Sequence, residues 1–246
     1  MLCYPFGLEY LRAHRSFRQL AVLLVRNGFD VLRFDYWGSG DSGGESHQAT
    51  LTHWSEDLQH AVRELRVRAG VREVSLVGLR LGATLVCSAA RSLAPVADLV
   101  LWDPVPAGTD YVEGLKRRHL NWLSQAMQEL PVELQAYQRA AAAAESQNGS
   151  GPFEVVGFPV THALRREIEG VDLMSTPAPP ARRILLLDTT SENSSGSNLC
   201  EHLSSAGAEC TQLHHPARPV WLGAAGATVP GDLLRRIVCW TSETSS

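Results

Sequence analysis

VSLVGLRLGATL, residues 74–85, is the stretch that decides the fold of this chain. Residues typical of a buried strand lead into Gly78-Leu79-Arg80-Leu81-Gly82, and the apolar residues that follow favour a helix. Two glycines at this spacing let a strand and a helix approach closely around a sharp turn. The stretch therefore predicts a strand–turn–helix unit with Arg80 at the tip of the turn, beside the free N–H groups of a helix N-terminus.

Strand and helix patterns alternate on both sides of this unit. After a short apolar start at residues 1–6, strands are predicted at residues 29–34, 73–77, 98–102, 183–188 and 209–213. Helices are predicted at residues 15–27, 52–68, 83–93, 199–207 and 229–240. Such alternation is typical of βαβ units and predicts an α/β fold with a mostly parallel sheet flanked by helices.

One segment interrupts this alternation. Residues 111–144 carry a helical pattern broken only by Pro131, and residues 146–152 have the composition of a loop. We therefore expect one α/β domain with a core of residues 1–106 and 177–246. Residues 107–176 are predicted to be a helical lid inserted over the carboxyl ends of the strands.

Composition excludes several classes of partner. The chain of 246 residues has a net charge of −4, so no basic excess indicates a nucleic-acid partner. No apolar run approaches the roughly 18 residues that a membrane span needs, and the first residues do not resemble a signal peptide. Five scattered cysteines without metal-type spacing predict reduced thiols, a cytoplasmic location, and neither a metal site nor a cofactor.

Several motifs, in the expected order, resemble the α/β-hydrolase superfamily. The run from Asp35 to Gly43, DYWGSGDSG, is similar to a segment that follows the fourth strand in serine aminopeptidase-like and lipase-like members. Phe6-Gly7 stands where these proteins usually have His-Gly, and Gly78–Gly82 stands at the nucleophile elbow, G-x-S-x-G. The resemblance implies an α/β-hydrolase fold from which the first two strands are missing.

The resemblance also implies a site at the carboxyl ends of the strands. Arg80 takes the nucleophile position, Asp188 matches the triad acid, and His214 or His215 matches the triad histidine. The other implied oxyanion or ligand-binding residues are Phe6, Gly7, Leu81, Glu9, Arg12 and Asp103. Glu9 and Arg12 are alternatively the charged face at the start of a helix.

A narrower resemblance concerns three segments, PFGLEYLRAHRSFRQLA, FDYWGSGDSGG and GLRLGATL. They look like α/β-hydrolase-type proteins associated with exosortase and exopolysaccharide gene systems, in which an arginine at the elbow is usual. This resemblance implies that Arg80 is a family trait and that the protein has a role in exopolysaccharide-related metabolism.

Arg80 changes the chemistry that the elbow can support. A guanidinium stays protonated at ordinary pH, so it cannot attack a carbonyl as a serine does. It adds positive charge to a helix N-terminus and should attract an anion. That anion is either an internal acid, Asp103 or Asp188, or part of a bound ligand.

Three functions remain open on the sequence alone. The first is a protein that binds a small anionic or acyl ligand and lacks serine nucleophilic chemistry. The second is an active ester or acyl hydrolase that uses a water activated by His215 or His214 with Asp188. The third is a non-catalytic interaction protein whose pocket is closed by an ion pair between Arg80 and an acid.

Overall fold

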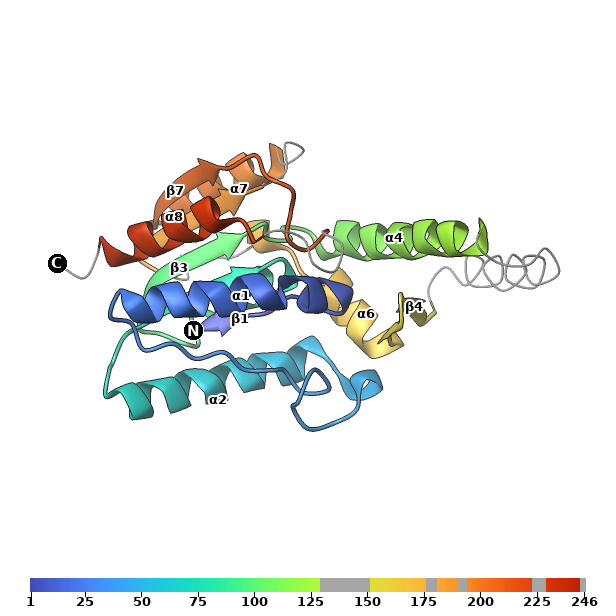
Figure 1. The fold of residues 1–246 in the computed structure, drawn as a ribbon, viewed down its shortest axis with the longest axis horizontal. Helices are drawn as coiled ribbons and strands as arrows, with labels where there is room; N and C mark the ends of the chain where they lie inside the picture. The colour runs from blue at the N-terminus through green and yellow to red at the C-terminus, as the bar shows by residue number, and fades with distance from the viewer. Residues whose placement is uncertain (129–150, 176–180, 190–193, 223–228, 244–246) are drawn as a thin grey trace.

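Five parallel strands form one sheet in a computed structural model, which describes residues 1–128, 151–175, 181–189, 194–222 and 229–243 (Figure 1). The order across the sheet is β1 (Leu2–Cys3), β2 (Val74–Leu79), β3 (Val96–Trp102), β6 (Arg183–Asp188) and β7 (Glu209–His214). Every neighbouring pair in this sheet is parallel. The carboxyl ends of β2, β3 and β6 therefore lie at one edge of the sheet, where the implied site was expected.

The central strands are almost continuously apolar because both of their faces are covered. Leu99, Val100 and Leu101 in β3 and Leu186 and Leu187 in β6 are completely buried. Parallel sheets with helices on both faces have this property. β7 is at the edge of the sheet, and its residues are exposed or half-buried.

Helices flank the sheet as the alternation predicts. α1 (Leu8–Arg26) packs against α8 (Gly231–Ser242), α3 (Leu81–Ala89) packs against β2 and β3 with α2 (Leu51–Ala69) beside it, and α7 (Ser194–Ser205) packs on β7. The buried stripe of α1 contains Ala13, Phe17, Leu20 and Leu24, which share one face at helical spacing. The helix is longer than expected, because it begins at Leu8 directly after Gly7.

The strand expected at residues 29–34 is not a regular strand. A single parallel bridge joins Leu2 to Arg33, and the Leu2 N–H donates to the Leu32 carbonyl at 2.9 Å. The reason lies in its partner, since β1 has only two residues and offers few ladder hydrogen bonds. Within the described ranges, no other strand pairs with this segment.

The segment at residues 107–176 leaves and rejoins the core at one place. Its described parts are α4 (Gly108–Gln128), a hairpin of β4 (Phe153–Val155) and β5 (Phe158–Val160), α6 (His162–Glu169) and a 3-10 turn, η2 (Leu173–Ser175). Ala107 bridges to Asp172, and the Gly108 N–H donates to the Val171 carbonyl at 2.9 Å. A Cβ atom on Gly108 would lie 1.6 Å from the Ile168 carbonyl oxygen, so this junction requires glycine.

The insertion is helical in α4 and α6, and residues 153–171, whose sequence pattern is mixed, also contain the β4–β5 hairpin, where Val156 and Gly157 have positive φ and form a tight turn. α4 is confirmed as a helix to Gln128, and the expected helical residues 129–144 lie outside the described residues. Figure 1 shows α4 projecting from the end of the sheet, away from both chain termini.

Cysteine pairing also differs from the expectation. A disulfide joins Cys200 in α7 to Cys210 in β7, and Cys3, Cys87 and Cys239 are free. The turn between α7 and β7 brings the two bonded Cα atoms to 5.7 Å, a proximity that sequence spacing does not reveal. The prediction that all the thiols are reduced is therefore wrong, and a cytoplasmic location loses that support.

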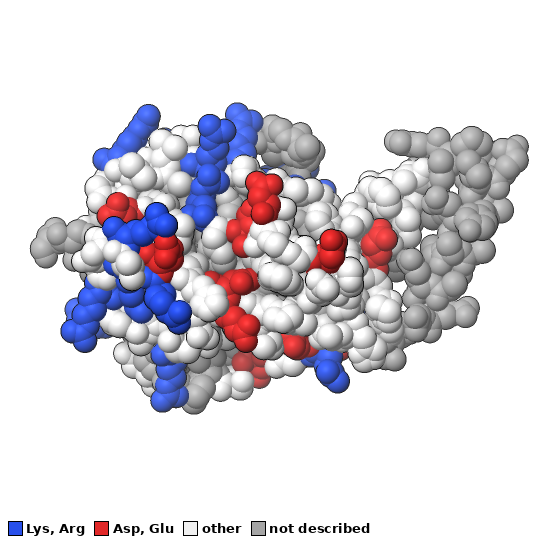
Figure 2. Space-filling view, turned by 90° about the horizontal axis from the view of Figure 1, so that it is seen from below, with Lys and Arg blue, Asp and Glu red and all other residues white. Residues whose placement is uncertain are grey.

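Charges of both signs are mixed over the face of the molecule seen in Figure 2. This mixture agrees with the small net charge of −4. Of the helices in the described ranges, none combines the length and the apolar character needed to cross a membrane.

Candidate functional site

The turn between β2 and α3 is a tight strand–helix junction with Arg80 at its tip. Arg80 has φ 53° and ψ −123°, a conformation that non-glycine residues rarely adopt. A Cβ atom on Gly78 would lie 2.4 Å from the Ala83 Cα, and one on Gly82 would lie 2.3 Å from the Tyr4 carbonyl oxygen. Both glycines are therefore required for close packing, as the sequence predicts.

The side chain of Arg80 is held on several sides. Its Nε lies 3.6 Å from Oε1 of Glu9, and its Nη1 donates to the backbone carbonyl of Asp103 at 3.3 Å. The ring of Trp221 covers the guanidinium at 4.0 Å, and the ring of Tyr111 lies 5.4 Å away. Only 15% of the Arg80 side chain is exposed, so this cation is enclosed by protein groups.

Glu9 is the acidic centre of the cluster. It lies in the first turn of α1 and is buried, with Oε1 at 2.7 Å from Nη1 of Arg118 and Oε2 accepting from the Tyr111 hydroxyl at 3.0 Å. One carboxylate thus faces two guanidinium groups, from α3's N-terminus and from α4. Burial raises the pKa of Tyr111 well above its usual value, so its hydroxyl remains a donor to Glu9.

The internal partner of Arg80 was expected to be Asp103 or Asp188, and this expectation is wrong. The carboxylate of Asp103 accepts instead from the Thr189 N–H and hydroxyl, at 2.7 and 2.5 Å, and from Nε1 of Trp221 at 2.8 Å. Burial raises the pKa of Asp103, and these three hydrogen bonds and the nearby charge of Arg80 oppose the rise. Glu9 pairs with Arg80 instead, because the first turn of α1, which carries Glu9, lies beside the turn at Arg80.

Asp188, His214 and His215 are not brought into contact with Arg80. Asp188 is buried and accepts from Nε2 of Gln212 at 3.0 Å, while His215 reaches it only through a backbone N–H that donates to the Asp188 carbonyl at 2.8 Å. His214 is exposed on the edge strand. In the described part of the chain, neither imidazole makes a hydrogen bond or an ion pair.

Trp221 was not anticipated from the sequence. It lies in the segment after β7, where the resemblance implied a histidine, and it contacts both Arg80 and Asp103. Its backbone carbonyl also accepts from Nη1 of Arg12 at 3.4 Å. Nothing in the local sequence distinguishes Trp221, because its role depends on how the chain folds back after β7.

Tyr111 and Arg118 were also missed, although their spacing offered a signal. They are seven residues apart in α4, so they share one helix face with Leu115 and Trp122. An amphipathic pattern with an arginine inside the apolar stripe is the feature that could have indicated them.

A cavity of about 220 Å³ lies beside this cluster. It is lined by Phe6, Leu8, Glu9, Arg12, Leu115, Arg118, Asn121, Trp122, Gln125, Val155, Val156, Trp221 and Leu222. Two arginines against one glutamate make the charge of this lining positive. The structure thus brings the predicted residues Phe6, Glu9 and Arg12 to one cavity under α4.

The remaining predicted residues lie at the base of the turn. Gly7, with φ 62°, precedes α1, and Leu81 is buried at the start of α3. Phe6 and Leu81 share a void of about 10 Å³ with Gly82. A void of this size holds at most about one water molecule.

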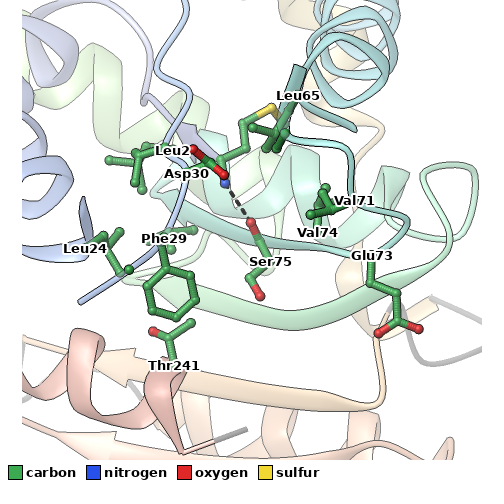
Figure 3. A pocket seen from close by; sticks show the side chains of 15 residues that line it. Leu2, Leu24, Phe29, Asp30, Leu65, Val71, Glu73, Val74, Ser75 and Thr241 are labelled. Carbon is green, nitrogen blue, oxygen red and sulfur yellow. Dashed lines mark hydrogen bonds between the residues drawn. The ribbon is translucent and has the colours of Figure 1, made fainter. Parts of the chain in front are cut away.

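A second cavity of about 220 Å³ lies at the opposite end of β2 (Figure 3). Leu2, Leu24, Phe29 and Val74 line it, and the Met1 amino group donates there to the Ser75 carbonyl at 2.7 Å. It contains none of the predicted site residues. Within the described residues, no group of His, Cys, Asp and Glu side chains could hold a metal ion.

Comparison with known proteins places this geometry in a wider context. A family model described as serine aminopeptidase, S33, matches residues 12–150, and none of the curated proteins matches the chain. Among solved structures, Est1E from Butyrivibrio proteoclasticus, with ferulic acid bound, is similar over 93% of this chain and 81% of its own, with 15% identity and a TM-score of 0.62.

Two further structures show the same likeness. A putative hydrolase from Agrobacterium vitis S4 covers 98% of this chain and 85% of its own, with 19% identity and a TM-score of 0.59. The Pyrococcus furiosus esterase Pf2001 covers 94% and 77%, with 16% identity and a TM-score of 0.57. At these identities the likeness concerns the fold, and it confirms the α/β-hydrolase architecture.

Proposed function

Because this chain belongs to the S33 serine aminopeptidase family of α/β-hydrolases, we propose that it keeps the family's ligand-binding architecture without its covalent chemistry. In this proposal the protein binds a small anionic or acyl ligand under α4 and forms no acyl-enzyme. Residues 107–176 act as the lid of that site.

The observation that carries the proposal is the position of Arg80. It occupies the tip of the turn where the family pattern has a serine, in the strained conformation that this turn requires. Its guanidinium is a permanent cation, and it is held by Glu9 and Trp221 instead of being free to react.

Neighbouring hydroxyl groups do not replace the missing serine. The Thr84 hydroxyl donates to the Val105 carbonyl at 2.9 Å and accepts from the Val105 N–H at 3.0 Å. The Ser75 hydroxyl, at the far end of β2, donates to Oδ2 of Asp98 at 3.1 Å. Both hydroxyls are therefore committed to structural hydrogen bonds.

A second candidate is a non-catalytic interaction protein with a closed pocket. The ion pair between Arg80 and Glu9 favours this candidate, because an arginine side chain that is only 15% exposed is already paired with an internal carboxylate. The cavity beside Arg118 favours ligand binding instead. The hydrolase that activates water through His215 or His214 and Asp188 draws no support from the described contacts.

The biological setting of the ligand is also part of the proposal. A role in exopolysaccharide-related metabolism is supported only by the resemblance of the elbow and glycine-rich segments to exosortase-associated proteins. A cytoplasmic location also stays part of the proposal, and the free thiols of Cys3, Cys87 and Cys239 support it.

Reactivity and ligand binding separate the candidates. A fluorophosphonate probe should leave the protein unlabelled, and p-nitrophenyl esters should not be hydrolysed above the buffer rate, with an active serine esterase as the positive control. Thermal unfolding with carboxylates, phosphates and acyl compounds should show stabilisation by one class, about 2.7 kcal/mol at a concentration of 100 times Kd. Covalent labelling would contradict the proposal, and a complete absence of ligand shifts would support the closed pocket.

A further inference from the structure

The cavity under α4 has a charged end and an apolar end. Glu9, Arg12 and Arg118 form the charged end, and Trp122, Val156 and other apolar side chains of α4, the β4–β5 hairpin and the segment after β7 form the apolar end. The polar residues Asn121 and Gln125 also line the cavity. A ligand that satisfies both ends must itself be amphipathic.

Arg118 lines the cavity and Arg80 does not. The rings of Trp221 and Tyr111 lie 4.0 and 5.4 Å from the guanidinium of Arg80, closer than the 5.4 and 5.9 Å that separate them from the guanidinium of Arg118. Arg118 lines the cavity, pairs with Glu9 through Nη1, and has a buried Nη2 without a hydrogen-bond partner. A guanidinium with an unused buried donor binds a carboxylate well.

The charges around Arg118 also favour an added anion. Arg12 lines the same cavity, and burial together with the nearby Arg118 lowers the pKa of Arg12. Glu9, whose side chain is 5% exposed, is shared between Arg118 and Arg80 and cannot neutralise all three arginines. One further negative charge would offset part of this positive excess.

The apolar end has exposed side chains that a ligand would cover. Trp122 is 46% exposed and Leu222 is 39% exposed, although both line the cavity. The volume of about 220 Å³ corresponds to about seven water molecules of liquid water, which admits one ring or a short chain. Larger ligands would have to displace part of the lining.

We propose that the ligand of this site is a small amphipathic monocarboxylate, with its carboxylate on Arg118 and its ring or short alkyl chain beside Trp122 and Leu222. This inference rests on the proposed function and specifies its ligand. In it, Arg80 is a positioning residue that holds Glu9, while Arg118 is the contact to the ligand.

Isothermal titration of the full chain tests the ligand class with benzoate, hexanoate, acetate, benzyl alcohol and inorganic phosphate. Benzoate or hexanoate should bind at least about tenfold more tightly than acetate, which lacks the apolar part, and than benzyl alcohol, which lacks the charge. Equal binding of benzyl alcohol and benzoate, or binding of phosphate alone, would overturn this inference. The broader proposal that the site binds a small ligand would then stand.

Variants of α4 test the contact residue. Arg118→Gln should weaken carboxylate binding by about tenfold or more, and Arg118→Lys should weaken it less because the charge remains. The matched control is Arg117→Gln, which removes the same charge from the neighbouring exposed position of α4 and should leave the affinity unchanged. Trp122→Ala should weaken binding of benzoate, with Leu120→Ala as the control on the exposed face.

The melting temperature of each variant shows whether it folds. If Arg118→Gln does not fold, Arg118→Lys still tests the contact. If carboxylates still bind to both Arg118 variants with unchanged affinity, Arg118 is not the contact to the ligand, while the proposed function would stand. Absence of any bound anion or acyl compound would remove both.

Discussion

The guanidinium carbon of Arg80 lies 4.0 Å from the centre of the Trp221 ring. The same indole donates from Nε1 to Oδ2 of Asp103 at 2.8 Å. In a serine hydrolase, contacts run from the nucleophile through a histidine to an acid. Here a comparable series of contacts runs from Arg80 through Trp221 to Asp103, but an indole N–H can only donate, so the series holds a cation in place and transfers no proton.

Trp221 should therefore contribute strongly to stability. Trp221→Ala removes a buried ring and a hydrogen bond and should lower the free energy of unfolding by about 3–5 kcal/mol. Trp221→Phe keeps a ring over Arg80 but leaves Asp103 one donor short, at a cost of about 1–3 kcal/mol. Urea denaturation measures both, with the exposed Trp122→Phe as a control expected within about 0.5 kcal/mol of the wild type. Equal stability of all three would contradict a structural role for Trp221.

A serine placed at position 80 should not by itself produce catalysis. Arg80→Ser supplies a hydroxyl, but Trp221 cannot remove its proton, and the described structure shows no contact from His214 or His215 to the turn. We expect p-nitrophenyl ester hydrolysis at the buffer rate for Arg80→Ser. The double variant Arg80→Ser with Trp221→His should react with a fluorophosphonate, because an imidazole there could donate to Asp103 and accept from the serine. Full activity of Arg80→Ser alone would show that another residue serves as the base.

Both glycines of the turn should resist substitution. Gly82→Ala would place a Cβ atom 2.3 Å from the Tyr4 carbonyl oxygen, and Gly78→Ala would place one 2.4 Å from the Ala83 Cα. Each should lower the free energy of unfolding by at least about 2 kcal/mol. Gly114→Ala in α4 meets nothing within 4 Å and should instead stabilise by about 0.5–1 kcal/mol. A stable Gly82→Ala protein would show that the turn is looser than described.

The ionisation of Asp103 should make the free energy of unfolding depend on pH. Burial raises the pKa of Asp103, so the folded protein keeps this proton to a higher pH than the unfolded chain does. The contribution of this group is then largest below its ordinary pKa, about 3.9, and is lost as pH rises through the raised value. Asp103→Asn cannot ionise, so the stability of the wild type relative to Asp103→Asn should fall as pH rises from below about 3.9 through the raised pKa of Asp103.

The control for this pH series is Asp30→Asn, at an exposed carboxylate. Denaturant titrations at several pH values measure the difference for each pair. A difference between wild type and Asp103→Asn that rises with pH would mean that the hydrogen bonds from Thr189 and Trp221 outweigh burial.

Thiol labelling tests the cysteine pairing. Burial raises the pKa of Cys3 and of Cys87 to about 12, so both remain protonated and shielded at pH 8, whereas Cys239 is exposed. Iodoacetamide should label one thiol in the native protein, three after unfolding without reductant, and all five after reduction. Labelling of all five without a reductant would show that Cys200 and Cys210 are not bonded.

Local patterns predicted most of the fold correctly. The sequence predicted the strands β2, β3 and β6 from their apolar runs, and the helices α1 and α2 from their periodic apolar stripes. These predictions were possible because the residues that each element buries follow one another at a fixed spacing along the chain. The segment at residues 29–34 failed because a strand needs a partner, and the two residues of β1 offer little pairing. The β4–β5 hairpin and the disulfide were missed because each depends on how a turn aligns its two arms.

The candidate site was predicted only in part. The sequence placed Arg80, Glu9 and Arg12 near one pocket. This was possible because local patterns show which residues stand at the end of a strand or at the start of a helix. The pairing of Arg80 with Glu9 instead of Asp103 or Asp188 was not predictable, since four different segments converge on that guanidinium.

By itself, the sequence determined the strand–turn–helix unit around Arg80, because an apolar run, two glycines and a second apolar run form a local pattern, although Gly82 is required by a contact with the distant Tyr4 carbonyl oxygen. It likewise determined that the residue at the tip of this turn is an arginine, a permanent cation. Only the tertiary structure decided what that cation touches, because Glu9, Tyr111 and Trp221 come from a helix before the turn, an insertion after it and a segment beyond the last strand. Such convergence depends on the path of the whole chain, and no local pattern encodes it.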